Sequence, residues 1–179
     1  WTIASYTKLF TEQPFLRWLG NSLVVSAGVT ATGVALASTA GYAFSRFRFT
    51  GRNATMLAIL TTQMFPATML LLPLYVLIAA VGLVNTWLGL MVFYTATALP
   101  FCVWQMKGFY DTIPPALEEA ARIDGCSRFQ AFWHVVLPLA TPGLVITALF
   151  SFMTAWSEYI VAAQVMQDER MFTLPLGIK

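Results

Sequence analysis

The stretch Glu118-Glu119-Ala120-Ala121-Arg122-Ile123-Asp124-Gly125 is a charged segment in an otherwise apolar part of the sequence. Four of these residues carry a formal charge, whereas the ranges 53–106 and 129–157 contain no Asp, Glu, Lys or Arg. Long apolar runs are typical of membrane-crossing helices, and charged residues gather in the loops between them. The segment is therefore expected to lie outside the membrane, where it can meet another protein.

The composition indicates a membrane protein. Of the 179 residues, 58% are hydrophobic and 10% are charged, and the mean hydropathy is +0.70. A helix of about 20 apolar residues crosses the hydrocarbon layer because it satisfies its own backbone hydrogen bonds. The net charge of only +2, spread over dispersed basic residues, argues against a nucleic-acid surface.

The apolar runs predict an all-α membrane bundle with about four spans. Arginines are enriched in cytoplasmic loops, so Arg46, Arg48 and Arg52 place the turn after the first span inside the cell. Counting spans from that turn puts the charged segment on the same side, and the tail after residue 163 outside. Prolines in the second span, Pro66 and Pro73, are expected to kink it. The predicted spans are residues 21–44, 54–80, 87–106 and 142–163, with a cytoplasmic loop at 107–141.

Within that loop the sequence predicts a short helix from Pro114 to Asp124. Proline suits a first helical turn, and Glu118 and Arg122 can form an ion pair at i,i+4. Gly125 can adopt the left-handed conformation that ends a helix.

A second helix is predicted from Ser127 to Val136. Ser127 can cap it, while Phe129, Phe132 and Trp133 give it an apolar side suited to packing against the membrane helices. Two ordered helices exceed what a passive connection needs, which indicates a docking role.

These residues resemble the cytoplasmic loop of the membrane subunits of bacterial ABC importers. The matching positions in the loop are Glu119-Ala120-Ala121, Asp124-Gly125, Phe129, Phe132, Pro138 and Pro142. Further segments resemble the second permease subunit of the maltose-type carbohydrate branch, namely Asn21-Ser22-Leu23, Gly41-Tyr42-Ala43-Phe44-Ser45-Arg46, Gln63-Met64-Phe65-Pro66 and Lys107-Gly108-Phe109-Tyr110. The resemblance implies a type I importer transmembrane domain. Because such permeases usually have six spans, one span is expected before Trp1 and another after Lys179.

The resemblance also implies a mechanism and a set of partners. The helix docks on a separate ATPase subunit, which binds ATP and Mg, so that this chain holds no cofactor and is not an enzyme. The sequence accordingly has no G-x-x-x-x-G-K-[ST] phosphate loop. The implied partners are a second permease, two ATP-binding subunits and an extracytoplasmic sugar-binding protein, assembled on the bacterial cytoplasmic (inner) membrane. The expected coupling residues are Glu118, Glu119, Ala120, Ala121, Arg122, Asp124, Gly125, Phe129 and Pro138.

Two further regions are candidates for contacts with substrate or with the binding protein. Glu158, flanked by Trp156 and Tyr159, suits sugar contact, but it can equally pair with a neighbouring helix. Gln63 has the same two interpretations. Maltose-type relatives present an external loop to the sugar-binding protein, although an ordinary polar turn would look alike. The residues expected there are Asp168, Glu169, Arg170 and Met171.

Other functions remain open alternatives. An importer of the same type for amino acids or phosphate would share the cytoplasmic loop. An ion-coupled secondary carrier would need ion sites in mid-membrane or an inverted repeat, and the scarcity of charges in the spans argues against it. Cys102, Cys126 and His134 lack the spacing or neighbours of metal ligands, so no metal site is expected.

Overall fold

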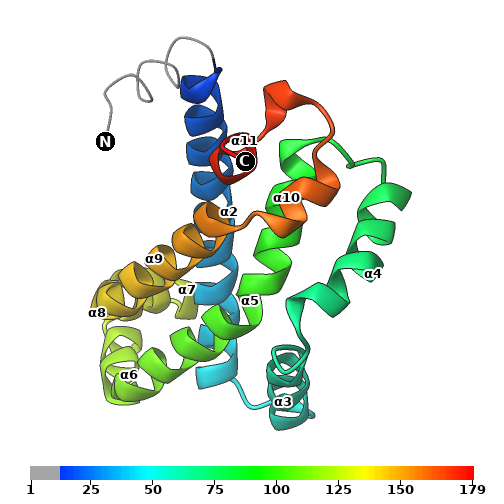
Figure 1. The fold of residues 1–179 in the computed structure, drawn as a ribbon. Coiled ribbons are helices and arrows are strands. Elements are labelled where there is room, and N and C mark those ends of the chain that lie inside the picture. Colours follow the sequence, from blue (N-terminus) through cyan, green and yellow to red (C-terminus); the bar gives the residue numbers. More distant parts are fainter. Residues whose placement is uncertain (1–12) are drawn as a thin grey trace, which may run out of the picture. The chain divides into compact units, whose positions relative to one another are not determined.

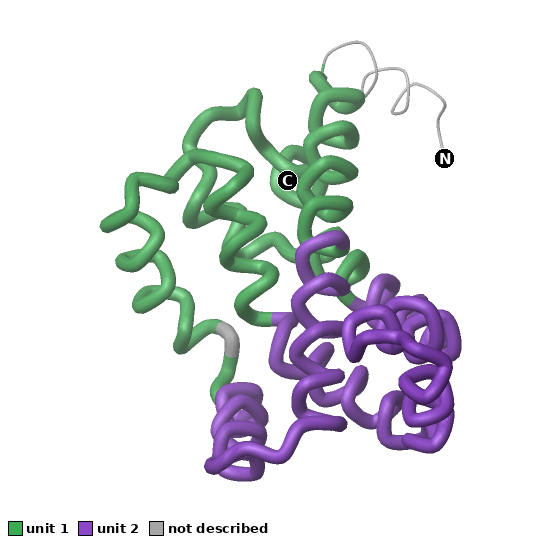
Figure 2. Tube along the Cα trace, turned by 180° about the vertical axis from the view of Figure 1, so that it is seen from behind, with its two compact units in different colours: residues 1–30, 65–97, 151–179 green, residues 31–64, 98–150 purple. Residues whose placement is uncertain are grey.

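The computed structural model describes residues 13–179, and every regular element within that range is helical (Figure 1). Trp1 lies outside the described residues. The chain divides into two compact units (Figure 2), residues 1–30, 65–97 and 151–179 in unit 1, and residues 31–64 and 98–150 in unit 2. The single permease domain expected from the sequence stays a prediction.

Two helices in the described part of the chain are long and apolar enough to cross a membrane. These are α2 (Phe15–Arg46) and α5 (Trp87–Thr112). They contain the first and third predicted spans. A third crossing is possible if Arg128–Leu139 and Thr141–Ser157, which are bent by 76° at a short break, form one span.

The second predicted span is interrupted rather than kinked. It consists of α3 (Arg52–Thr62) and α4 (Ala67–Ala80), and α4 begins directly after Pro66, which has φ −56° and ψ 133°. A proline restricts the residue before it to extended conformations, so the chain leaves the helix there. Pro73 lies inside α4 without ending it.

The fourth predicted span is interrupted as well. Helix α9 (Thr141–Ser157) ends before Glu158, and the short α10 (Ile160–Val165) follows.

Unit 2 has a core of aromatic and aliphatic side chains. Met106, Tyr110 and Val136 are fully buried in it. A Cβ added at Gly41 would stand 2.8 Å from the Cβ of Met106, so the backbones of α2 and α5 lie close together at this point. Only glycine permits this approach, which fixes the end of α2 beside the end of α5.

Unit 1 has its own core, in which Val25, Leu90 and Val165 are fully buried. The chain after α10 forms the 3-10 turn η2 (Glu169–Met171) and the short α11 (Leu174–Gly177). These elements lie against the start of α2, since a Cβ at Gly177 would stand 2.1 Å from the Trp18 ring.

Candidate coupling site

Helix α6 (Pro115–Ile123) is closed by a complete glycine cap. Gly125 has φ +92°, which L-residues with a Cβ rarely adopt. Its N–H donates to the Arg122 carbonyl at 3.2 Å, and the Cys126 N–H donates to the Ala121 carbonyl at 3.0 Å. These two bonds are the pair that defines the Schellman motif. The predicted helix and its end at Gly125 are therefore present.

The next helix starts with the predicted cap. The N–H of Gln130 donates to Ser127 Oγ at 3.3 Å, and the Ser127 N–H donates to Gln130 Oε1 at 2.8 Å. This reciprocal capping box fixes the start of α7 (Arg128–Ala131).

A widened π turn, η1 (Phe132–Val136), leads from α7 to α8 (Leu137–Leu139). Pro138 lacks an N–H, and in a regular helix its ring would clash with the carbonyl four residues earlier. The π turn directly before it relieves this clash, with the Leu137 N–H donating to the Phe132 carbonyl.

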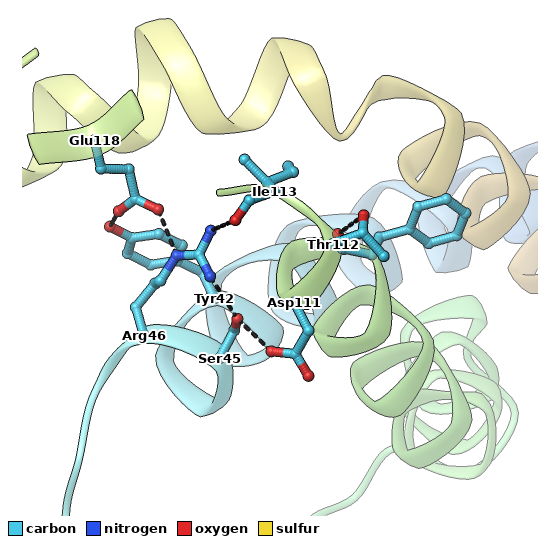
Figure 3. A network of polar contacts seen from close by, with 8 residues as sticks. Tyr42, Ser45, Arg46, Asp111, Thr112, Ile113 and Glu118 are labelled. Atoms are coloured by element: carbon cyan, nitrogen blue, oxygen red, sulfur yellow. Dashed lines mark hydrogen bonds and ion pairs between the residues drawn. The ribbon is translucent and has the colours of Figure 1, made fainter. Parts of the chain in front are cut away.

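Glu118 points inward from α6 to the end of α2 (Figure 3). Its carboxylate forms an ion pair with Arg46 Nε and accepts a hydrogen bond from the Tyr42 hydroxyl at 2.8 Å. The Arg46 and Glu118 side chains are each only 12% exposed. Glu118 is thus held by another helix.

The expected Glu118–Arg122 ion pair is not formed. Among the residues that the structure describes, the ion pairs are Arg46–Glu118 and Lys107–Asp111. Arg122 is exposed, and a pair on the surface gains little in water. Arg46 offers a sheltered partner with several donors instead.

A second set of contacts joins the end of α2 to the end of α5. The Ser45 hydroxyl donates to Asp111 Oδ1 at 2.6 Å, and Lys107 forms an ion pair with the other carboxylate oxygen. Arg46 Nη1 donates to Ser45 Oγ at 3.2 Å. We call these residues together the Arg46 network: Tyr42, Ser45, Arg46, Lys107, Asp111 and Glu118.

Sequence reasoning placed only Glu118 of this network in the site. In the sequence, Arg46 indicated only the cytoplasmic side of a turn and was one of the residues that resemble the maltose-type branch. The sequence did contain one sign of this pair. Arg46 follows the first predicted span, and Glu118 lies in the next loop on the same, cytoplasmic side of the membrane.

Helix α6 has one buried face and one exposed face. Ala121 is buried, at 9% exposure, whereas Ile123 is 86% exposed. The predicted coupling residues Glu119, Ala120, Arg122, Asp124, Gly125 and Pro138 are all exposed. Apolar and charged groups therefore alternate on a surface suited to docking.

The apolar side predicted for the second helix is only partly correct. Phe132 is buried, at 5% exposure, and its ring lies 4.5 Å from that of Tyr42, centroid to centroid. Phe129 and Trp133 are 72% and 55% exposed and stack on each other at 6.3 Å. The Phe129 and Trp133 rings are therefore exposed as a stacked pair, whereas the Phe132 ring is packed in the core.

A hollow of about 190 Å³ lies beside α6. Glu119, Arg122 and Arg128 line it together with Tyr42, Arg46 and Glu118 of the Arg46 network. Arg128 is placed by Phe47, whose ring centroid is 5.9 Å from the guanidinium carbon. The mixed charges suit polar side chains of a protein partner.

Comparison with known proteins shows the family. Residues 33–178 match the family described as binding-protein-dependent transport system inner membrane component. The chain belongs to this family. The family predicted from the residues of the cytoplasmic loop is thereby confirmed.

Individual relatives agree with this membership. The chain is 34% identical to the maltodextrin transport system permease protein MdxG of Bacillus subtilis, over 100% of this chain and 64% of that protein. It is 40% identical to the maltose/maltodextrin transport system permease protein MalG of Salmonella typhimurium, over 93% of this chain and 58% of that protein. The chain spans less than two thirds of the length of these relatives.

The fold also matches a solved structure. A bacterial ABC transporter involved in the import of the acidic polysaccharide alginate has a chain with a TM-score of 0.84 to this one. The two are 26% identical, and the match covers 96% of this chain and 59% of that one. The predicted all-α fold of an importer transmembrane domain is confirmed.

Glu158 caps the start of α10 with its carboxylate. Its carboxylate accepts the N–H of Val161 at 2.9 and 3.1 Å and that of Ala162 at 3.4 Å, and Tyr94 donates its hydroxyl at 3.1 Å. This arrangement favours the structural interpretation of Glu158 over sugar contact.

The other predicted pathway residues within unit 1 have aromatic and cation–π contacts of their own. Trp156 stacks on Phe152, with centroids 5.5 Å apart, and Lys179 lies over the Tyr159 ring at 5.2 Å. Gln63 belongs to unit 2, where it follows the last turn of α3.

The predicted binding-protein segment has a backbone fixed by side chains of unit 1. Asn21 Nδ2 donates to the carbonyls of Arg170 and Phe172 at 3.0 and 2.9 Å. Trp18 Nε1 donates to the Glu169 carbonyl at 3.2 Å.

Asn85, in the turn before α5, holds the start of the same segment. It has φ 57°, and its Oδ1 accepts the N–H groups of Gln167 and Asp168 at 2.9 and 3.0 Å. The charged side chains of Asp168, Glu169 and Arg170 remain exposed, while Met171 is half-buried. A fixed backbone with exposed charged side chains suits a contact surface.

Proposed function

We propose that this chain is the permease subunit of an ATP-driven, binding-protein-dependent importer that moves a sugar or oligosaccharide into the cytoplasm. The observation that carries the proposal is the geometry of α6. Glu118 and Ala121 hold its inner face to the rest of unit 2, while Glu119, Arg122 and Asp124 face outward. Family membership and the maltodextrin named in two relatives support it.

In the proposed mechanism, α6 docks on an ATPase subunit that binds ATP and Mg. ATP binding moves the docked helix as a rigid body, because α6 is capped at its end and fixed at its first turn by Glu118. Packed helices change between discrete arrangements rather than deforming continuously. The displacement therefore switches the spans between inward-open and outward-open states. Two ATPase subunits, a second permease and an external sugar-binding protein complete the transporter in the bacterial inner membrane.

The test is uptake by the assembled transporter in proteoliposomes. We expect uptake of a labelled maltodextrin to require ATP and the binding protein, and to be independent of proton or sodium gradients. Uptake driven by an ion gradient without ATP would contradict the proposal and indicate a secondary carrier.

The solute class is tested on the binding protein itself. Titration with maltodextrins, amino acids and phosphate, followed by intrinsic tryptophan fluorescence, should show saturable binding of the sugars alone. Binding of an amino acid or phosphate instead would show an importer of the same type for a different solute.

A further inference from the structure

Arg46 joins three parts of unit 2 through one guanidinium group. Its Nε pairs with Glu118 of α6, and its Nη2 donates to the Ile113 carbonyl, between α5 and α6, at 2.7 Å (Figure 3). The third nitrogen donates to Ser45. Removing one partner of a buried ion pair leaves an uncompensated charge, which is costly. The contact is therefore expected to persist when α6 moves.

Tyr42 strengthens the same junction from one helical turn earlier. Its hydroxyl donates to Glu118, while its ring packs against Phe132 of η1 and edge-on against Tyr110 of α5 at 5.8 Å. The last turn of α2 thus contacts both helical segments of the cytoplasmic loop.

The chain itself links α6 to α5 but not to α2. Arg46 and Glu118 are 72 residues apart in the sequence, so their contact is a tertiary connection. Without it, α6 would be joined directly to α2 only by the Tyr42–Glu118 hydrogen bond and by apolar packing, and indirectly by the Ser45–Asp111 hydrogen bond between α2 and α5.

We propose that Arg46 is a positioning residue that makes the last turn of α2 move with α6, so that the ATPase cycle drives α2 as well as α5. This inference rests on the proposed function, since it requires α6 to be the docking helix. Arginine suits this role because its planar fork donates to Glu118 and to the Ile113 carbonyl at once. A lysine has one ammonium group and cannot hold both positions in the same way.

The experiment measures coupling in the assembled transporter with this subunit at full length. The readout is the amount of labelled maltodextrin, or of the ligand found by titration, transported per ATP hydrolysed. For Arg46→Met we expect retained copurification with the ATPase and about a tenfold lower ratio, because the largely enclosed Glu118 loses its charged partner and α2 its ion pair to α6. Arg46→Lys should be intermediate. The matched control is Arg48→Met, at an exposed arginine outside the network.

A second variant covers the case in which Arg46→Met does not assemble. Tyr42→Phe removes only the hydroxyl that donates to Glu118 and should give a smaller decrease in the ratio. A wild-type ratio in Arg46→Met, or in both Arg46→Lys and Tyr42→Phe if Arg46→Met does not assemble, would overturn the proposal.

Failure of this inference can be told apart from failure of the proposed function. If Glu119→Lys on the outer face of α6 leaves sugar uptake normal, the docking role of α6 itself is wrong. If Glu119→Lys abolishes uptake while Arg46→Met keeps the wild-type ratio, only the role of Arg46 is wrong.

Discussion

Gly125 combines an unusual backbone with open space around it. Its φ is +92°, and a Cβ built on it would meet no atom within 4 Å. A substitution there is therefore opposed by backbone strain alone and not by a clash. Because the two capping bonds depend on this conformation, the angle at which α6 leaves the loop depends on it too.

We expect Gly125→Val to uncouple transport while leaving membrane insertion intact. A β-branched residue in the left-handed region costs roughly 1–2 kcal/mol, whereas asparagine is tolerated better. Gly125→Asn is thus the matched control and should retain most activity. Sugar uptake by reconstituted variants, with membrane fractionation as the check on insertion, measures this. Normal uptake by Gly125→Val would contradict the prediction.

The neighbouring glutamates Glu118 and Glu119 should differ in what they stabilise. Glu118→Ala breaks a sheltered ion pair and is expected to destabilise the permease by about 3 kcal/mol, whereas Glu119→Ala should stay within about 0.5 kcal/mol because its side chain is exposed. Thermal unfolding of the detergent-purified permease pair tests this. Equal melting temperatures for the two variants would show that the Arg46 contact adds no stability.

At the scale of elements, α6 and the cap of α7 were predictable because their signals are local. Proline at the start, Gly125 at the end and Ser127 before the next helix act within a few residues of themselves. The partner of Glu118 was not predictable in this way. Local spacing pointed to Arg122, and only the tertiary packing of α2 brings Arg46 to the carboxylate.

The interruptions of the second and fourth predicted spans were also not predicted from the sequence. By hydropathy alone, residues 54–80 form one apolar run. The structure breaks this run into two helices, because Pro66 excludes a helical conformation at the residue before it. Likewise, Glu158 looked like an ionisable group in a pathway. Its role at the start of α10 depends on the chain bending so that the carboxylate meets the backbone N–H groups of Val161 and Ala162.

The segment after α10 gives a prediction at the same scale. Asn21→Asp replaces the amide donor to the carbonyls of Arg170 and Phe172 by an acceptor, so both hydrogen bonds are lost. At about 1 kcal/mol for each bond, local opening should become at least about tenfold more frequent. Trypsin cleavage after the exposed Arg170 should accelerate accordingly.

The matched control for this experiment is Asn85→Asp. At that position the side-chain oxygen accepts hydrogen bonds from Gln167 and Asp168, and a carboxylate keeps this capacity. Its cleavage rate should stay near that of the wild type. Similar rates for the two variants would mean that Asn21 does not fix the segment.

At the scale of the whole molecule, the residues proposed for ATPase coupling differ from those considered for contact with the solute or the binding protein. Unit 2 contains α6 and the Arg46 network, whereas unit 1 contains Glu158 and the segment around Arg170. In the proposed transporter, this permease therefore transmits displacement, while the binding protein selects the solute.

This division predicts how Glu158→Ala should affect transport. If Glu158 serves only to fix the start of α10, its loss weakens the helix by roughly 1–2 kcal/mol and lowers the uptake of every accepted sugar by the same factor. If it binds sugar, the relative uptake of different sugars changes, because an unmet hydrogen-bonding group discriminates between ligands. Competition between labelled maltodextrins of two lengths separates these cases. An unchanged preference with reduced uptake of both supports the structural role, and a shifted preference would place Glu158 in the sugar pathway.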